Sequence, residues 1–358
     1  MTYNFSSGPA TLPDAVIAAI RNDLPSWRGT GQPLMTLSHR GADFIELMAV
    51  VKAKLRQALA IPDSHDILIL QGGGMGQFAA VPLNLTHPGD KVSFLLTGNW
   101  GVQAAKEAGN YQLCVDRPAD QQSGNYTTLP PLENLAIDPA SAYLHYVPNE
   151  TIQGVEFSTP PVTVVPLVAD ASSQILSRPM DVGAHGVIFA GTQKNLGVAG
   201  AVVVIIDRAL LGRARLETPS ILDYTKMSQA DSLLNTPTTF AVYVLDLMLD
   251  WVARLGGVEA MAVESRAKAD LVYAAIDASD FYRNPVEQSA RSTKNIPFTM
   301  ADPSLDRQFL AEAEAAGLMF LEGHRSVGGM RASLYNAMPQ VGVVTLVDFI
   351  KDFERRNG

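Results

Sequence analysis

The sequence predicts an α/β protein with a large domain built on a mostly parallel sheet flanked by helices, followed by a smaller α+β domain. Three observations lead to this fold class. The 358 residues exceed what one hydrophobic core usually supports, which favours two domains. Between about residues 66 and 206, short apolar runs alternate with helical or loop segments. Beyond residue 236 the apolar spacing becomes helical, as expected of segments that lead into a second domain.

The first predicted elements are a helix and the strands of the sheet. Residues 43–59 place apolar side chains at helical spacing, and Pro62 follows the end of that helix. The runs that follow are rich in β-branched residues and nearly continuous, as in a sheet that is buried on both faces. They are DILIL (66–70), KVSFLL (91–96), SAYLHYV (141–147), TVVPLVAD (163–170), GVIFAG (186–191) and AVVVIID (201–207).

The last predicted elements are helices that connect the two domains. Thr236 is typical of a helix N-cap, with Pro237 at the first helical position. The helix FAVYVLDLMLDWVARL ends at Gly256-Gly257, and a second helix over 258–277 leads into the smaller domain. We expect a large domain over residues 15–262 and a small one over 263–358, joined by the N-terminal segment 1–14.

Composition and charge exclude several classes of function. A formal charge of -9 argues against a nucleic-acid or anionic-membrane surface, although local arginines can still bind a small anion. Cys114 is the one cysteine, so no internal disulfide forms, and a reducing compartment fits. It lies in YQLCVD, which reads as a buried strand. We see no signal peptide and no apolar run long enough to span a bilayer, and therefore expect a cytoplasmic protein.

A glycine run directly follows the strand DILIL. In Gly72-Gly73-Gly74-Met75-Gly76, the backbone N–H groups can approach an anion, and a following helix N-terminus favours phosphate. The run lacks the Gly-Lys-Ser/Thr ending of a Walker loop and the spacing of a dinucleotide site. A tight strand-to-helix turn is the alternative interpretation.

An acid and a lysine end two successive strands. Asp170 closes TVVPLVAD, where a carboxylate needs a partner such as a pyridinium N–H, or else caps a helix. Lys194, in GTQKN, follows the next strand and can form a Schiff base with an aldehyde cofactor, although most single lysines are solvated. Ligands bind at the carboxyl ends of strands in such sheets, so the two side chains can flank one ring.

Aromatic and basic residues complete the candidate site. Trp100 follows the strand KVSFLL and can stack on a flat ring, although core packing is the common fate of tryptophan. Arginine binds carboxylate and phosphate bidentately, which favours an anionic substrate over ordinary surface charge for the basic residues as a set. These are His39-Arg40, His324-Arg325 and Arg331.

Many segments along the whole chain closely resemble those of the phosphoserine aminotransferases, a class V family of fold-type I pyridoxal-phosphate enzymes. The segments that carry the resemblance are NFSSGPA (4–10), SHRG (38–41), GGGMGQFAA (72–80), HYVPNET (145–151), ILSRP (175–179), GTQKN (191–195), PSILDY (219–224), NTP (235–237), GHR (323–325), GGMR (328–331) and YNAMP (335–339). Their number and order make a chance match very improbable.

The resemblance implies a seven-stranded sheet in the large domain, pyridoxal 5'-phosphate as cofactor and no metal. It makes Lys194 the Schiff-base lysine and Asp170 the partner of the ring nitrogen. The other cofactor-binding residues that it implies are Gly74, Met75, Trp100, Thr151, Gln193, Asn235 and Thr236, of which Asn235 and Thr236 reach the neighbouring subunit of a homodimer. The substrate-binding residues that it implies are Ser7, His39, Arg40, His324, Arg325 and Arg331, with Arg331 on the α-carboxylate and the His-Arg pairs on the phosphate. Many relatives have arginine in place of Met75.

The activity implied is amino transfer between glutamate and 3-phosphohydroxypyruvate, which gives 2-oxoglutarate and 3-phospho-L-serine. The resemblance also permits formation of 4-phosphohydroxy-L-threonine in vitamin B6 biosynthesis. The alternatives are another class V activity, such as alanine–glyoxylate transamination or cysteine desulfuration, and a non-catalytic cofactor-binding protein. Desulfuration would need a cysteine on a mobile loop, which the setting of Cys114 does not suggest. A transaminase for small substrates would not need the two His-Arg pairs, and replacing Arg325 would then leave its activity unchanged.

Overall fold

The structure, a computed structural model, describes residues 1–358, and for Asn134 the backbone alone. A seven-stranded sheet dominates it, in the order β2-β10-β9-β8-β5-β3-β4. Every neighbouring pair is parallel apart from β10, which runs antiparallel to both β2 and β9. The fold class is therefore confirmed. The strands are β2 (His65–Gly72), β3 (Lys91–Leu96), β4 (Cys114–Asp120), β5 (Ser141–Tyr146), β8 (Leu167–Asp170), β9 (Val187–Gly191) and β10 (Gly200–Asp207).

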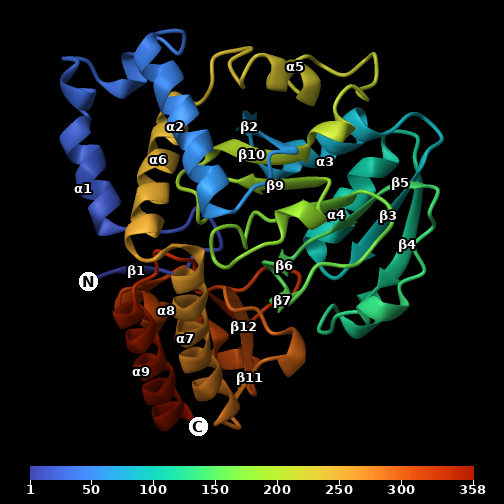
Figure 1. Ribbon diagram of the computed structural model, residues 1–358. Coiled ribbons are helices and arrows are strands. Elements are labelled where there is room, and N and C mark those ends of the chain that lie inside the picture. The colour runs from blue at the N-terminus through green and yellow to red at the C-terminus, as the bar shows by residue number, and fades with distance from the viewer.

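Helices cover both faces of this sheet (Figure 1). Because successive side chains of a strand point to opposite faces, each strand feeds two cores. In β2, Ile67 and Ile69 pack in the cluster formed with α2 (Ala42–Ala58) and α6 (Thr239–Arg254). Leu68 and Leu70 pack in the opposite cluster, with α3 (Gly74–Leu85), α4 (Asn99–Gly109) and α5 (Tyr224–Gln229). This double burial explains the continuous apolar runs in the sequence.

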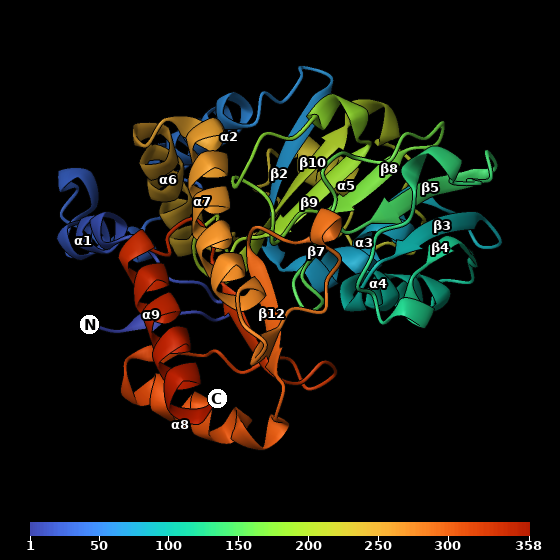
Figure 2. The ribbon, with the colours of Figure 1, turned by 90° about the horizontal axis from the view of Figure 1, so that it is seen from below.

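The C-terminal part of the chain has a core of its own. The long helix α7 (Gly257–Asp277) leads into it, and Figure 2 shows α7, α8 and α9 beside β12. Its sheet has the order β11-β12-β14, and the N-terminal strand β1 pairs in parallel with β13. The elements are β1 (Tyr3–Asn4), β11 (Tyr282–Arg283), β12 (Asn295–Met300), α8 (Asp306–Ala315), β13 (Leu318–Met319), β14 (Met330–Ser333) and α9 (Gln340–Asn357). A boundary at residue 262, inside α7, stays a prediction.

The remaining elements are short. They are α1 (Asp14–Asp23), the hairpin of β6 (Asn149–Glu150) and β7 (Val155–Glu156), and 3-10 turns at Trp27–Gly29, Leu34–Thr36, Gln122–Gly124, Leu132–Asn134, Val182–Ala184, Arg208–Leu210, Gln288–Ala290 and Pro303–Leu305. Among the described helices, all are too short or too polar to cross a membrane.

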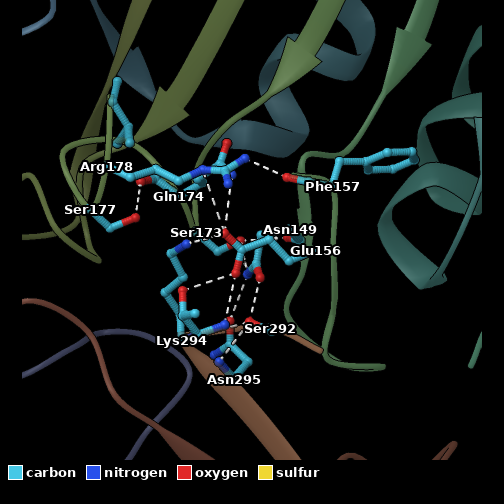
Figure 3. A network of polar contacts seen from close by, with 12 residues as sticks. Asn149, Glu156, Phe157, Ser173, Gln174, Ser177, Arg178, Ser292, Lys294 and Asn295 are labelled. Carbon is cyan, nitrogen blue, oxygen red and sulfur yellow. Dashed lines mark hydrogen bonds and ion pairs between the residues drawn. The ribbon is translucent and has the colours of Figure 1, made fainter. Parts of the chain in front are cut away.

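A buried polar network joins the β6–β7 hairpin to the C-terminal part (Figure 3). The Glu156 carboxylate accepts hydrogen bonds from the Lys294 ammonium and, at 2.7 Å, from the backbone N–H of Thr293. Asn149 Nδ2 donates to Asn295 Oδ1 at 2.8 Å, and Ser292 Oγ donates to Asn149 Oδ1 at 2.5 Å. Both halves of the chain therefore meet through satisfied polar groups as well as apolar contacts.

Three local predictions are wrong. Helix α6 begins at Thr239 with Thr238 as N-cap, so Thr236 lies outside it, and the Thr236 carbonyl instead accepts a hydrogen bond from the Gln71 side chain. Strand β8 covers only the end of 163–170, since Pro166 lacks the N–H that a ladder requires and Val164 is 85% exposed. Cys114 is exposed, because β4 is an edge strand.

Candidate active site

A cavity of about 250 Å³ lies where the carboxyl ends of several strands of the large sheet meet. It collects seven of the predicted site residues from separate segments of the chain: Gly74, Met75, Trp100, Thr151, Asp170, Gln193 and Lys194. Gly73, which belongs to the glycine run identified in the sequence, also lines the cavity. The other residues of its wall were not among the predicted site residues, and they are Phe78, Val147, Asn149, Ser172 and Ser173. Ser172 and Ser173 could have been found, because they lie two and three residues after Asp170 at the end of a strand.

Asp170 is the last residue of β8 and is buried. Its Oδ1 accepts a hydrogen bond from the backbone N–H of Ser172 at 3.0 Å. Burial raises the pKa of Asp170, and the hydrogen bonds from Ser172 and the charge of Lys194 oppose that rise. A cationic N–H in the cavity would stabilise the ionised form further, so this carboxylate favours a positively charged partner.

Lys194 is buried and lies directly beyond β9, the strand next to β8. Its Nζ donates to the Thr151 hydroxyl at 2.9 Å and lies 6.0 Å from the centroid of the Tyr335 ring. A Cβ atom at Gly8 would lie 3.5 Å from Lys194 Cγ, so the N-terminal segment packs against this side chain. A buried amine held this way at the wall of a cavity is suited to attack a carbonyl carbon and to carry a proton.

The helices α3 and α4 both begin at this edge of the sheet, and among the described side chains a carboxylate occupies the start of α4 but not that of α3. Helix α3 begins at Gly74, with Gly73 as its N-cap, and both residues line the cavity. A Cβ at Gly74 would come within 3.2 Å of Ser172 Oγ, so glycine keeps this approach open. The N-terminus of α4 is already occupied, because its backbone N–H groups donate to the Glu150 carboxylate. An anion such as phosphate therefore fits at the start of α3.

Other predicted site residues lie outside the cavity lining. The Ser7 carbonyl accepts a hydrogen bond from Tyr335 at 2.9 Å, which places the N-terminal segment near Lys194. Arg331 lies on β14 and is buried, and its Nε has no hydrogen-bond partner among the described residues. Desolvation lowers its pKa, so an anion that pairs with it would stabilise the charge.

The two His-Arg pairs do not come together in the cavity of one chain. His39 and Arg40 lie just before α2, whereas His324 and Arg325 lie between β13 and β14. Arg325 lines a separate surface groove of about 640 Å³. Asn235 Nδ2 donates to Gln71 Oε1 at 3.1 Å, which places Asn235 and Thr236 at the edge strand β2.

Comparison with known proteins assigns the class of the molecule. Residues 2–346 match the family model of the class-V aminotransferases, and the chain belongs to that family. It is 48% identical to the phosphoserine aminotransferase of Aromatoleum aromaticum, over 99% of each chain. Among solved structures, the phosphoserine aminotransferase from Bacillus circulans subsp. alkalophilus superposes with a TM-score of 0.98 at 39% identity, over 100% of this chain and 99% of the other. The PLP-bound enzyme from Trichomonas vaginalis gives 0.94 at 35% identity, over 98% and 100%.

Proposed function

We propose that this enzyme transfers an amino group between glutamate and 3-phosphohydroxypyruvate, giving 2-oxoglutarate and 3-phospho-L-serine, with pyridoxal 5'-phosphate as cofactor. The observation that carries the proposal is the placement of Lys194 and Asp170 on one buried cavity beside a free helix N-terminus. The full-length similarity to proteins named phosphoserine aminotransferase supports the choice of substrates.

The cavity fits the proposed cofactor in chemistry. The open start of α3 at Gly74 and Met75, with Gln193 nearby, would hold the phosphate, and Asp170 would pair with the ring nitrogen. The Met75 side chain is 65% exposed, so this role needs only its backbone N–H. When bound, pyridoxal phosphate supplies an aldehyde that condenses with amines and a protonated ring that accepts electron density from the substrate.

Residues of the chain then carry the proton transfers. Lys194 Nζ would remove the proton from the α-carbon of the amino donor and deliver one to the aldehyde carbon of the bound cofactor, so the amine would end each half-reaction in the protonation state in which it began. Thr151 holds Nζ through the 2.9 Å hydrogen bond and so limits the positions that the amine can take. Asp170 would keep the ring nitrogen of a bound cofactor protonated, because a buried carboxylate without a cationic partner is costly. Trp100 forms one wall of the cavity and excludes water from this exchange.

Substrate recognition is assigned to basic side chains around the cavity. Arg331 would bind the α-carboxylate, assisted by Ser7, because its buried Nε has no partner among the residues that the structure describes. His324 and Arg325, with His39 and Arg40, would bind the phosphate of the substrate. These pairs lie on different segments and do not line the cavity of one chain, so a complete phosphate site requires further elements.

A homodimer would supply those elements. Asn235 and Thr236 lie at the outer edge strand of the sheet and not in the cavity of their own chain, as expected of residues that serve a neighbouring subunit. Exposed apolar side chains, including Met75 and Ile221, also favour a covering partner. Mass measurement in solution tests this assignment.

The cytoplasmic location and the second substrate, which would yield 4-phosphohydroxy-L-threonine, stay predictions from the sequence.

A visible absorption spectrum tests the proposed function. The purified protein, with the cofactor added, should be yellow, lose the yellow band with glutamate and regain it with phosphohydroxypyruvate. Lys194→Ala should abolish this cycle, whereas Lys351→Ala, at an exposed position on α9, should leave it unchanged. A wild-type protein that takes up no cofactor would refute the proposal. Recovery of the band with glyoxylate but not with the phosphorylated acid would point to the alternative class V activity.

A further inference from the structure

Glu150 is a buried carboxylate behind the wall of the candidate active site. It lies on β6 between Asn149 and Thr151, which both line the cavity, and its side chain is fully shielded from solvent. Its Oε1 accepts from the backbone N–H of Gly101 at 2.8 Å, and its Oε2 from that of Trp100 at 3.1 Å. The carboxylate is thus bound to the first turn of α4 by both oxygens.

The start of α4 depends on this carboxylate. The first N–H groups of a helix lack intrahelical partners and carry partial positive charge. Gly98, the N-cap residue of α4, has no side chain that could satisfy them. Gln153 Oε1 accepts from the backbone N–H of Asn99 at 3.0 Å, so the hairpin that carries Glu150 binds three successive N–H groups of this turn.

Gly98 and Glu150 fit one another sterically. A Cβ atom at Gly98 would lie 2.4 Å from Glu150 Cδ and 2.5 Å from Glu150 Cγ, which no real contact allows. Glycine at position 98 is therefore required for the close approach of the carboxylate. Any side chain there would displace either Glu150 or the start of the helix.

The Trp100 side chain makes few contacts that could fix its position independently of its backbone. Its indole Nε1 is buried without a hydrogen-bond partner among the described residues. The ring packs on Phe78 at a centroid distance of 6.5 Å and an interplanar angle of 50°. Since the indole makes no polar contact in the described chain, its orientation follows from the backbone to which it is attached, and Glu150 holds that backbone.

The charges of the site also act on Glu150. Burial raises its pKa to about 7, the amides of Gly101 and Trp100 oppose the rise, Asp170 adds to it, and Lys194 opposes it. The charges of Asp170 and Lys194, which both line the cavity, therefore act on the Glu150 carboxyl group.

We propose that Glu150 is a positioning residue, whose carboxylate fixes the first turn of α4 and thereby the indole of Trp100 against the cofactor ring. This inference rests on the proposed function, because it assumes that a flat ring binds beside Trp100.

The experiment measures Trp100 directly, without and with cofactor. In a Trp27→Phe/Trp251→Phe background, Trp100 is the only tryptophan, so its fluorescence reports on this wall alone. Glu150→Ala should shift the emission of the cofactor-free protein and weaken binding of pyridoxal 5'-phosphate, measured by quenching, about tenfold. Glu150→Gln, which keeps one acceptor oxygen and the shape, should have an intermediate effect.

Three further variants separate positioning from general stability. Gly98→Ala should reproduce the effects of Glu150→Ala, and the losses should not add in the double variant Gly98→Ala/Glu150→Ala, because the clash with Glu150 is then relieved and only the 2.7 Å approach to Gln153 Oε1 remains. Asp223→Ala is the matched control. Asp223 caps α5 through two backbone N–H groups, so its loss should lower stability without moving Trp100 emission or cofactor affinity.

The outcomes are distinct. Unchanged emission and unchanged cofactor affinity in Glu150→Ala and Glu150→Gln would overturn the positioning role. So would an equal change in Asp223→Ala. A background protein with Glu150 intact that fails to bind pyridoxal 5'-phosphate would instead refute the proposed function, while the emission of the cofactor-free variants would still decide whether Glu150 positions Trp100.

Discussion

Lys194 Nζ donates a 2.9 Å hydrogen bond to the Thr151 hydroxyl across a buried contact. The amine is therefore held at one place in the cavity before any substrate enters. Removal of this hydroxyl in Thr151→Val should lower kcat about tenfold, because the Lys194 amine loses its orientation. KM should change little, because Arg331, which would bind the substrate carboxylate, is unchanged. Steady-state kinetics with glutamate measure both constants. Thr163→Val, on a loop remote from the cavity, is the control, and an equal loss there would contradict the assignment.

Asp170 provides a second prediction, because its charge and its shape can be separated. Asp170→Asn keeps the shape but removes the negative charge that would pair with a ring cation. The first half-reaction with glutamate should slow by about two to three orders of magnitude in single-turnover measurements, because preorganised charge is a large term in catalysis. A variant that reacts at the wild-type rate would show that Asp170 serves only to accept the hydrogen bond from the backbone N–H of Ser172.

Arg325 distinguishes a phosphorylated substrate from a small one. Arg325→Ala should raise KM for phosphohydroxypyruvate by at least about tenfold, since a bidentate contact to phosphate is lost, and leave KM for glutamate nearly unchanged. Arg307→Ala, on the same surface groove, is a neighbouring control. Equal kinetics of Arg325→Ala and wild type with the phosphorylated acid would favour a small-substrate transaminase.

The buried pair of Glu156 and Lys294 should make a large contribution to stability (Figure 3). Glu156→Gln leaves the Lys294 charge buried without its partner, and Lys294→Met leaves Glu156 only the guanidinium of Arg178, 3.6 Å away. The first should lower the free energy of unfolding by about 3–5 kcal/mol and the second by somewhat less. The double variant should lose clearly less than the sum of the two. Urea unfolding of the four proteins measures this coupling. Additive losses would mean that the two charges do not stabilise one another.

Acid should weaken the contact between Glu156 and Lys294. Burial alone would raise the pKa of Glu156, but Lys294 and Arg178 outweigh it and hold that pKa at about 2, below the usual value of 4.5. A carboxyl with a lowered pKa contributes stability above its unfolded pKa, and the contribution is lost as the pH falls from about 4.5 to about 2. The urea midpoint of the wild type should fall more steeply than that of Glu156→Gln over this range. Parallel curves would rule out Glu156 as an acid-sensitive group.

Much of the fold and of the candidate site could be predicted because both depend on local patterns. Continuous apolar runs such as 201–207 identify strands that are buried on both faces, and β10 occupies that segment. Asp170 ends β8, and Lys194 lies three residues beyond the end of β9, the next strand in the sheet, so sequence order already placed them together. The failures were local as well. Thr236-Pro237 resembles a helix start, but α6 begins two residues after Pro237. The Thr236 carbonyl instead accepts a hydrogen bond from the Gln71 side chain.

The sequence by itself determined the class of fold, the strand ends that carry chemistry and the resemblance to an aminotransferase family. Those features follow from periodicity and from short motifs, in which the relevant residues are close along the chain. Only the tertiary structure decided that Glu150 occupies the start of α4, that Asn149 bonds to Asn295, and that Cys114 is exposed on an edge strand. Asn149 and Asn295 are 146 positions apart, and no local pattern specifies which buried polar group will meet which. The pairing is set by the packing of the whole chain, because a buried polar group is stable only where the fold supplies its partner.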